Sequence, residues 1–274
     1  MSKKRMHNAL YVVIAAIISV MFVLPVFWVV LSSFKTPNEI FSVPPVMIPK
    51  KFLLDNYIEA LERADFVLYF KNSAIVAIAT TTLAVMINTM AGYAFAKYRF
   101  KGANLIFMIF LSTSMLPLEV LMIPIFQVVK KLGLYNTMAG LIIPAAATPT
   151  GVFLVRQYFL SVPSELMEAA RIDGASEMKI LARVMIPLAK PILSVLAILN
   201  FMWSWNSYLW PLIVVRSKDL YTVQVAIRNF SGENSVNWGG ILSMSVVTMI
   251  PMLIIFLIFQ KQFVRGMATT GLKG

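Results

Sequence analysis

Long uncharged apolar runs recur along the chain, and they predict helices that cross a membrane. A helix rises about 1.5 Å per residue, so roughly 20 apolar residues span a bilayer core. These runs lack the alternation of polar and apolar positions that marks membrane β-strands. We therefore predict an all-α membrane protein with a single domain, residues 1–274. Its six spans are expected at residues 9–31, 73–96, 104–129, 138–158, 187–215 and 239–260.

A polar stretch, residues 159–186, separates the fourth predicted span from the fifth. A proline and an acidic residue near its start indicate a helix N-terminus, and this helix is expected to run to about Asp173. Gly174 then stands where a left-handed residue ends a helix. Ser176 is expected to cap a second short helix through Val184. The predicted structure is a helix, a glycine elbow and another helix.

The residues of this stretch favour contact with a protein over contact with lipid. Ala169 and Ala170 keep one side of the first helix thin enough for another backbone to approach, and Glu168 and Arg171 place charge beside it. A helix that lies on lipid headgroups has a stronger basic face and large apolar anchors. A soluble partner that grips this stretch is therefore expected.

Two long loops are expected on the opposite side of the predicted membrane, and the first of them is the largest loop of the chain. Residues 32–72 begin with several prolines, which favour extended and turn conformations, and are expected to contain a short helix, Asp55–Arg63. Residues 216–238 contain a turn signal at Ser231–Asn234. Neither loop is long enough to fold as a separate soluble domain.

Composition and charge agree with this topology. Charged residues make up 13% of the chain, about half of the share in soluble domains. An even number of spans puts both termini on one side, and the basic loop Lys97–Lys101 places that side in the cytoplasm. Lys130 and Lys131 oppose this orientation. The net charge of +12 then follows from topology, and binding to nucleic acid is not needed to explain it.

Other residue types exclude several kinds of site. Basic residues precede the first apolar run, but the run is too long for a signal-peptide core, so an uncleaved anchor is expected. The chain has no cysteine, which excludes disulfides and thiolate metal sites. His7 is the single histidine, and no cluster of metal ligands is expected.

Polar residues within the predicted spans are candidates for a solute path. Buried polar groups are costly in lipid and mark function, although amides also join helices as structural contacts. The candidates are Glu119, Asn88, Asn206 and Asn200. Aromatic residues at 203, 205, 208 and 210 suit either stacking on sugar rings or an interfacial aromatic belt.

Three motifs resemble one known family over essentially the whole chain. Glu168-Ala169-Ala170, then Gly174 and then Pro187 at the expected spacing, resemble the EAA loop of permease subunits in ATP-binding-cassette importers. Residues 205–211 resemble a segment of the carbohydrate-importer branch. Residues 263–274 are similar to the tail of the smaller permease in maltose-type systems.

The resemblance implies a function, a set of partners and a location. It implies a permease subunit of a bacterial or archaeal inner membrane that imports a sugar, such as an oligosaccharide, and is not itself an enzyme. The implied partners are a second homologous permease in a heterodimer, two ATPase subunits, an extracytoplasmic solute-binding protein and membrane lipid, without nucleic acid. The implied residues of ATPase coupling are Glu168, Ala169, Ala170, Asp173, Gly174, Ala175 and Pro187.

No nucleotide site is expected in this chain, so ATP and Mg are assigned to the partner ATPase. Residues 266–273 superficially suggest a phosphate loop, but Leu272 interrupts the Gly-Lys pair that such a loop requires. One alternative is the same machinery carrying a glycerol phosphodiester or polyol. A secondary carrier is less favoured, because internal repeats and a network of ionisable residues are not found. A scaffold or receptor would leave the polar stretch unexplained.

Overall fold

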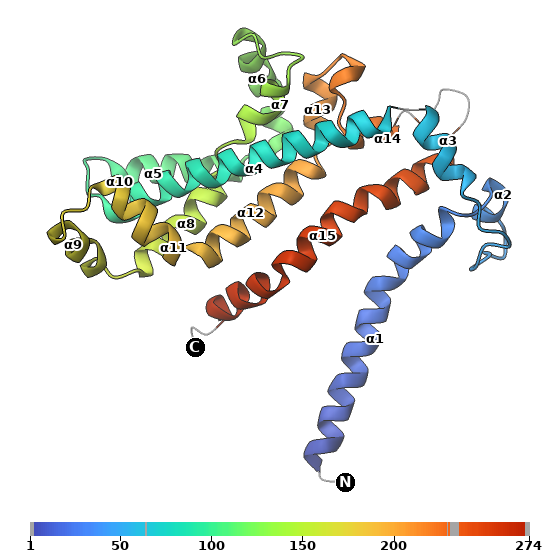
Figure 1. Ribbon diagram of the computed structural model, residues 1–274, viewed down its shortest axis with the longest axis horizontal. Helices are drawn as coiled ribbons and strands as arrows, with labels where there is room; N and C mark the ends of the chain where they lie inside the picture. Colours follow the sequence, from blue (N-terminus) through green and yellow to red (C-terminus); the bar gives the residue numbers. More distant parts are fainter. Residues whose placement is uncertain (1–2, 64, 229, 231–235, 272–274) are drawn as a thin grey trace. The chain divides into compact units, whose positions relative to one another are not determined.

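The computed structural model describes residues 3–63, 65–228, 230 and 236–271. For residues 3–9, 63 and 261–271 it describes the backbone alone. Within these residues the regular elements are all helices (Figure 1). The chain divides into two compact units, residues 1–67 with 226–250 and residues 68–225 with 251–274. The predicted turn Ser231–Asn234 and the last three residues of the predicted tail lie outside the described residues.

The first unit is organised around one asparagine. It contains α1 (Lys3–Ser32), α2 (Pro37–Ile40), α3 (Asp55–Arg63) and the first part of α15 (Trp238–Gly271). Asn56 Nδ2 donates to the backbone carbonyls of Ser33 and Lys35 at 2.8 and 3.0 Å, and the backbone carbonyl of Asn56 accepts from Ser243 Oγ at 3.1 Å. Asn56 therefore joins the end of α1 to α3 and α15. The predicted helix Asp55–Arg63 is confirmed.

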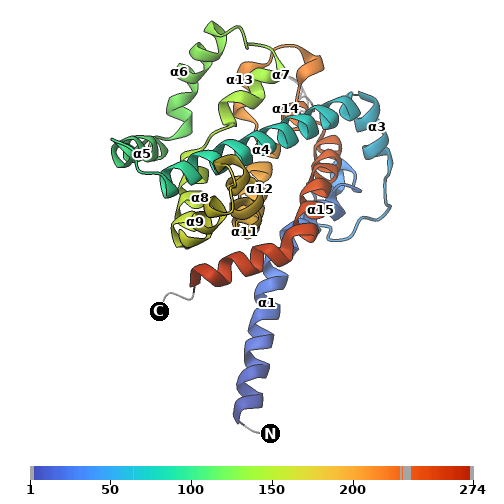
Figure 2. The ribbon, with the colours of Figure 1, turned by 60° about the vertical axis from the view of Figure 1, so that its left-hand side comes forward.

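The second unit contains the remaining helices, except that residues 66–67 of α4 and 226–228 of α14 belong to the first unit. These are α4 (Phe66–Lys97), α5 (Ala103–Ser112), η1 (Thr113–Met115), α6 (Leu118–Lys131), α7 (Met138–Ile142), η2 (Ile143–Ala145), α8 (Pro149–Ser161), α9 (Glu165–Ile172), α10 (Glu177–Ile180), η3 (Leu181–Met185), α11 (Ile186–Leu188), α12 (Lys190–Trp205), α13 (Leu209–Val214), η4 (Lys218–Leu220) and α14 (Val223–Arg228), followed by the end of α15. In Figure 2, α8 and α12 lie beneath α4, while α6, α7 and α13 form a separate group.

Three of the predicted spans are continuous helices and the other three are broken. In the part of the chain that is described, α1, α4 and α15 are each long and apolar enough to cross a membrane. The segment α5–η1 meets α6 at 112°, α7–η2 meets α8 at 43°, and the helices before and after Ala189 meet at 81°. Pro117 immediately precedes α6 and Pro149 begins α8, as expected because proline cannot continue a helical hydrogen-bond ladder. The total becomes six if each bent pair is one span.

Helix α4 carries a core at each of its two ends. Near its start, Val76 packs with Val129, Leu141, Val214 and Val215 from α6, α7, α13 and the residue that follows α13. Near its end, Tyr93 belongs to a core that includes residues of α8 to α12. Seventeen residues separate Val76 from Tyr93, a distance of about 25 Å along the helix. One helix thus connects two packed regions at opposite ends of the unit.

The last third of α4 lies very close to α8. A Cβ added at Gly92 would be 2.8 Å from the Cβ of Val155 and 2.9 Å from the backbone nitrogen of Arg156. At the next contact, Asn88 Nδ2 donates to Thr148 Oγ1 at 3.2 Å, and Asn88 Oδ1 accepts from the Thr148 N–H at 3.1 Å. A small residue and a buried amide therefore fix how α4 and α8 meet.

We expect Gly92→Leu to destabilise the second unit. The backbone of Arg156 cannot move aside as a flexible side chain would, so α4 and α8 must separate. Such overpacking costs about 1–3 kcal/mol, which lowers the melting temperature by roughly 2–12 °C in a chain of this size. Thermal unfolding of the purified protein in detergent measures this. Met90→Leu, an exposed change two residues away on α4, serves as the control, and equal melting temperatures for the two variants would contradict the close contact.

Candidate functional site at the glycine elbow

The elbow after α9 is built by hydrogen bonds between backbone groups. Gly174 has φ +79°, and its N–H donates to the carbonyl of Arg171 at 3.0 Å, while the N–H of Ala175 donates to the carbonyl of Ala170 at 2.9 Å. These two bonds define a Schellman motif, which satisfies carbonyls that the end of a helix leaves free. The predicted left-handed residue at position 174 and the helix end near Asp173 are both confirmed.

One face of α9 packs onto the core at the end of α4. Met167 is buried, and Ala170 and Ala175 pack against the same core, which includes Tyr93 and Phe159. Ala169, in contrast, is exposed. The two alanines therefore have different surroundings: Ala170 allows α9 to approach its own core, and Ala169 alone keeps the outer face thin.

The outer face of this segment combines acidic and large apolar side chains. Glu168 and Asp173 are exposed, Ile172 is 87% exposed and Met178 is 66% exposed. The sequence analysis identified Glu168 and Asp173 but missed Ile172 and Met178. A large apolar residue two positions before a glycine that ends a surface helix is a signal that would have found Ile172.

The second helix differs from its prediction. Ser176 stands at the N-cap of α10, but its side chain makes no capping hydrogen bond. α10 ends at Ile180, and the chain continues as a π-helix, Leu181–Met185, instead of an α-helix through Val184. Pro187 has no N–H for the carbonyl of Arg183, so the regular ladder cannot continue there. π-Turns of this kind frequently accompany functional sites.

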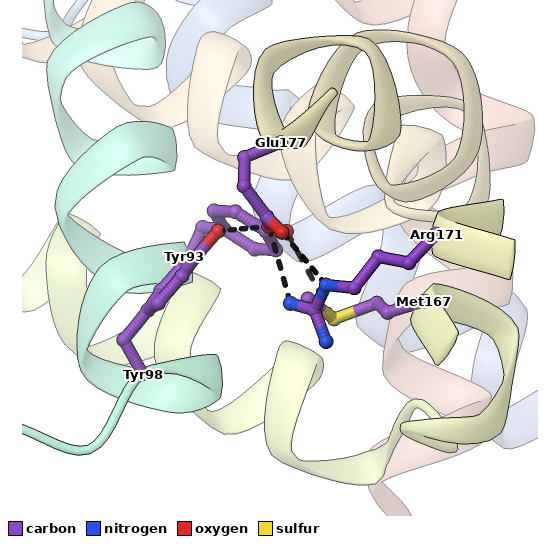
Figure 3. A network of polar contacts seen from close by, with 5 residues as sticks. All are labelled: Tyr93, Tyr98, Met167, Arg171 and Glu177. Carbon is purple, nitrogen blue, oxygen red and sulfur yellow. Dashed lines mark hydrogen bonds and ion pairs between the residues drawn. The ribbon is translucent and has the colours of Figure 1, made fainter. Parts of the chain in front are cut away.

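Three polar side chains meet across the elbow (Figure 3). Arg171 Nε donates to Glu177 Oε1 at 2.7 Å, and the terminal guanidinium nitrogen Nη2 donates to Glu177 Oε2 at 3.1 Å. The hydroxyl of Tyr98, just after α4, donates to Glu177 Oε2. The same end of α4 contributes Lys97, whose ammonium donates to the carbonyl of Val162, and Tyr93, whose hydroxyl lies 3.9 Å from the Met167 sulfur.

These contacts shift the pKa values of Glu177 and Tyr98. The hydrogen bonds from Arg171 and then from Tyr98 lower the pKa of Glu177 from 4.5 to about 2. Burial and the hydrogen bond to Glu177 raise the pKa of Tyr98. Because the folded pKa of Glu177 is depressed, the ionic contact is fully present above pH 4.5 and is lost only as the pH falls towards 2. The contact is therefore constant across the physiological range.

Sequence reasoning missed the roles of Tyr98 and Glu177. Opposite charges at 171 and 177 on either side of a helix-ending glycine are a signal for their pairing. Tyr98 lies more than 70 residues earlier, and its approach depends on the packing of α4 against α8. No local pattern indicates that contact.

The four candidates for a solute path have different surroundings. Asn88 is buried and its amide is used between α4 and α8. The amides of Asn200 and Asn206 donate to carbonyls one turn earlier in α12, at 2.8 and 2.9 Å. Glu119 is exposed in the first turn of α6, directly after the 112° bend. Glu119 and Asn206 are thus the exposed members of the set, and the four are not one contiguous cluster of contacts.

The aromatic residues at the end of α12 and in α13 also have different surroundings. Trp205 is buried and stacks on Phe201, with ring centroids 5.7 Å apart. Trp210 Nε1 donates to the carbonyl of Gly140 at 3.2 Å. Trp203 is exposed. The two tryptophans at 205 and 210 therefore have structural contacts within the second unit, while Trp203 is open to lipid or to another chain.

Comparisons with known proteins identify the family. Residues 88–269 match the model of the "Binding-protein-dependent transport system inner membrane component" family. The arabinooligosaccharides transport system permease protein AraQ of Halalkalibacterium halodurans is 38% identical over 262 residues, 94% of each chain. The sn-glycerol-3-phosphate transport system permease protein UgpE of Pectobacterium atrosepticum is 35% identical over 238 residues, which are 84% of this chain and 85% of that protein.

A solved structure shares the fold. One chain of a bacterial ABC transporter involved in the import of the acidic polysaccharide alginate superposes with a TM-score of 0.82, at 24% identity, over 95% of this chain and 98% of that one. The family expected from the EAA-like motif is thereby confirmed. The chain belongs to the family of binding-protein-dependent transport system inner membrane components, which are the permease subunits of ATP-binding-cassette importers.

Proposed function

We propose that this chain forms half of the solute path of a carbohydrate importer and is driven by ATPase subunits that dock on α9 and the glycine elbow. The observation that carries the proposal is the outer face of the elbow, where Ile172 is 87% exposed beside Glu168 and Asp173. Burying an isoleucine side chain contributes about 1.5–3 kcal/mol. A partner with an apolar cleft and a basic rim would recover that energy and pair with the acids.

The partners follow from the family and from this face. Two ATPase subunits would bind ATP and Mg and hydrolyse the ATP, one of them held by this chain. A second, homologous permease would complete the path as a heterodimer, and an extracytoplasmic solute-binding protein would deliver the solute. The coupling set is Glu168, Ala169, Ala170, Asp173, Gly174, Ala175 and Pro187. Within it, the structure supports an inward role for Ala170 and a backbone role for Gly174 and Ala175.

The proposed topology has six spans with both termini in the cytoplasm of a bacterial or archaeal inner membrane. Three continuous helices and three bent pairs support this number. Tyr93 and Val76 lie about 25 Å apart on α4, close to the thickness of a bilayer core. The elbow, which packs near Tyr93, then lies at the cytoplasmic surface, and residues 32–65 lie outside.

An oligosaccharide is the solute that we favour, because the arabinooligosaccharide permease is 38% identical along nearly the whole chain. Glu119 and Asn206 are the exposed polar candidates for contact with it. Asn88 and Asn200 would hold the helices that line the path through their hydrogen bonds within the chain. A glycerol phosphate is the second candidate, since the sn-glycerol-3-phosphate permease is 35% identical. An acid at Glu119 would repel a phosphate, which favours the neutral sugar.

Single cysteines test the topology, because the natural chain has none. Ser176→Cys, in the exposed elbow region, should resist a membrane-impermeant maleimide in intact cells and react after permeabilisation. Val43→Cys, at a side chain that is 95% exposed, should react in intact cells. Mass shift of the purified protein measures both. The reverse pattern would place the elbow outside, where no ATPase could reach it.

Two substitutions on the outer face test docking. Glu168→Lys and Ile172→Asp should each reduce co-purification of the ATPase subunits at least tenfold, since a loss of about 1.4 kcal/mol suffices and like charges at an interface cost up to several kcal/mol. Membrane level and pairing with the second permease should stay normal. Lys179→Glu changes charge on the neighbouring α10 and is the matched control. Normal ATPase retention by both variants would refute docking at this face.

Uptake by reconstituted vesicles tests the solute and the role of Glu119. With the cognate binding protein present, labelled arabinooligosaccharide should enter, and glycerol phosphate should not. Glu119→Gln keeps the shape of the side chain and removes its charge, so sugar uptake should fall several-fold while subunit assembly remains intact. Uptake of glycerol phosphate without uptake of the oligosaccharide would make glycerol phosphate the favoured solute. Unchanged sugar uptake would remove Glu119 from the path.

A further inference from the structure

The contact between Tyr98, Glu177 and Arg171 joins three elements of the second unit. Arg171 belongs to α9, Glu177 begins α10, and Tyr98 directly follows α4. The carboxylate of Glu177 receives both the guanidinium fork of Arg171 and the hydroxyl of Tyr98. We call these three residues the elbow clasp, because they hold the two arms of the elbow to one another and to α4.

The geometry of the elbow clasp suits orientation more than stability. Arg171 and Glu177 are 42% and 47% exposed, and exposed ion pairs contribute little to folding. A fork that donates two parallel hydrogen bonds nevertheless fixes the angle between its partners. The hydroxyl of Tyr98 donates a third hydrogen bond to the same carboxylate and so fixes its position relative to the end of α4. Lys97 and Tyr93 make further contacts from the same end of α4, so α9 and α10 are positioned against α4 at several points.

Near its other end, α4 is attached to η4, to Tyr221 and to the first residue of α14. Asn72 Nδ2 donates to the carbonyls of Asp219 and Tyr221 at 2.7 and 3.0 Å. Ser73 Oγ accepts from the N–H of Val223 at 2.8 Å. The 25 residues from Asn72 to Lys97 cover about 38 Å of continuous helix. Within this unit, α4 therefore connects the elbow with residues 219–223.

We propose that the elbow clasp makes α9 and α10 move with α4 as one rigid piece, so that a displacement of the docked elbow is transmitted to α4 and residues 219–223. This inference rests on the proposed function, in which an ATPase displaces α9. Tyr98, Glu177 and Arg171 are then positioning residues. They differ from Glu168 and Ile172, which are proposed to touch the ATPase, because loss of the elbow clasp leaves docking intact and weakens only the transmission.

The elbow itself explains why such a clasp is needed. A Cβ added at Gly174 would meet open space, and a glycine can adopt more backbone conformations than other residues. The two Schellman hydrogen bonds close the turn, but they do not fix α10 relative to α4. The π-helix that follows α10 breaks the regular ladder towards α12. The elbow clasp joins α9 and α10 to the end of α4 without passing through the glycine or the π-helix, in addition to the core that Met167 and Ile180 share with Tyr93.

The experiment compares ATP hydrolysis with uptake in vesicles that contain the complete complex and its binding protein. Tyr98→Phe removes the hydrogen bond from Tyr98 to Glu177, and Glu177→Ala removes the carboxylate that accepts every hydrogen bond described for the elbow clasp. We expect normal ATPase retention and an unchanged melting temperature for both. Solute uptake per ATP hydrolysed should fall about threefold or more, within the range of coupling changes caused by residues between two sites. The double variant Tyr98→Phe with Glu177→Ala should have the same uptake per ATP as Glu177→Ala alone, because the effects of substitutions within one hydrogen-bond network are not additive.

Two further variants separate positioning from a general loss of charge. Lys179→Gln, also on α10 and exposed, should leave uptake per ATP unchanged. Exchange of the pair, Arg171→Glu with Glu177→Arg, should restore part of the coupling that Glu177→Ala loses. Unchanged uptake per ATP in Tyr98→Phe and Glu177→Ala, with ATPase retained, would overturn the elbow clasp and leave the proposed function standing. Failure of the natural chain to retain an ATPase would overturn both.

Discussion

The close approach of α4 to α8 is the contact on which the described arrangement of the second unit depends. Lipid tails are as apolar as leucine side chains, so helices in a membrane associate through close packing and hydrogen bonds. Gly92 allows the packing, with Val155 against its backbone, and Asn88 supplies the hydrogen bonds to Thr148. Because α8 leads directly into α9, this contact also determines which end of α4 the elbow meets.

The contact gives the buried amide a definite physical role. Asn88 donates and accepts on the same residue, Thr148, whose own hydroxyl accepts from the N–H of Gly151 at 3.2 Å. In the first turn of α8, the N–H of Gly151 is thus satisfied by the N-cap residue Thr148, and the N–H of Thr148 is satisfied by Asn88 from a neighbouring helix. A broken span is tolerated in lipid when another helix supplies its missing partners. Thr148 and Asn88 together meet that requirement.

Sequence reasoning reached the helical class, the helix Asp55–Arg63 and the helix-then-glycine geometry at Gly174, because each depends on local signals. Apolar runs reveal helices without showing where they bend, so the 112° and 81° breaks were not foreseen. The exposure of Ile172 and the opposite surroundings of Ala169 and Ala170 depend on which face of α9 meets the core. That face is determined by the core that contains Tyr93, more than 70 residues before α9, so hydropathy could not supply it.

The polar stretch has separate groups for its contacts within the chain and for the contacts proposed outside it. Arg171 and Glu177 neutralise one another, and the carboxylate also accepts from Tyr98. Glu168 and Asp173 stay exposed beside Ile172. An acid engaged by an arginine fork has few acceptor positions left for a partner, whereas an exposed acid beside an apolar side chain retains all of them. The two sets of charged residues therefore have different proposed functions. Arg171 and Glu177, which bind each other, orient the elbow, and Glu168 and Asp173, which stay exposed, recognise the partner.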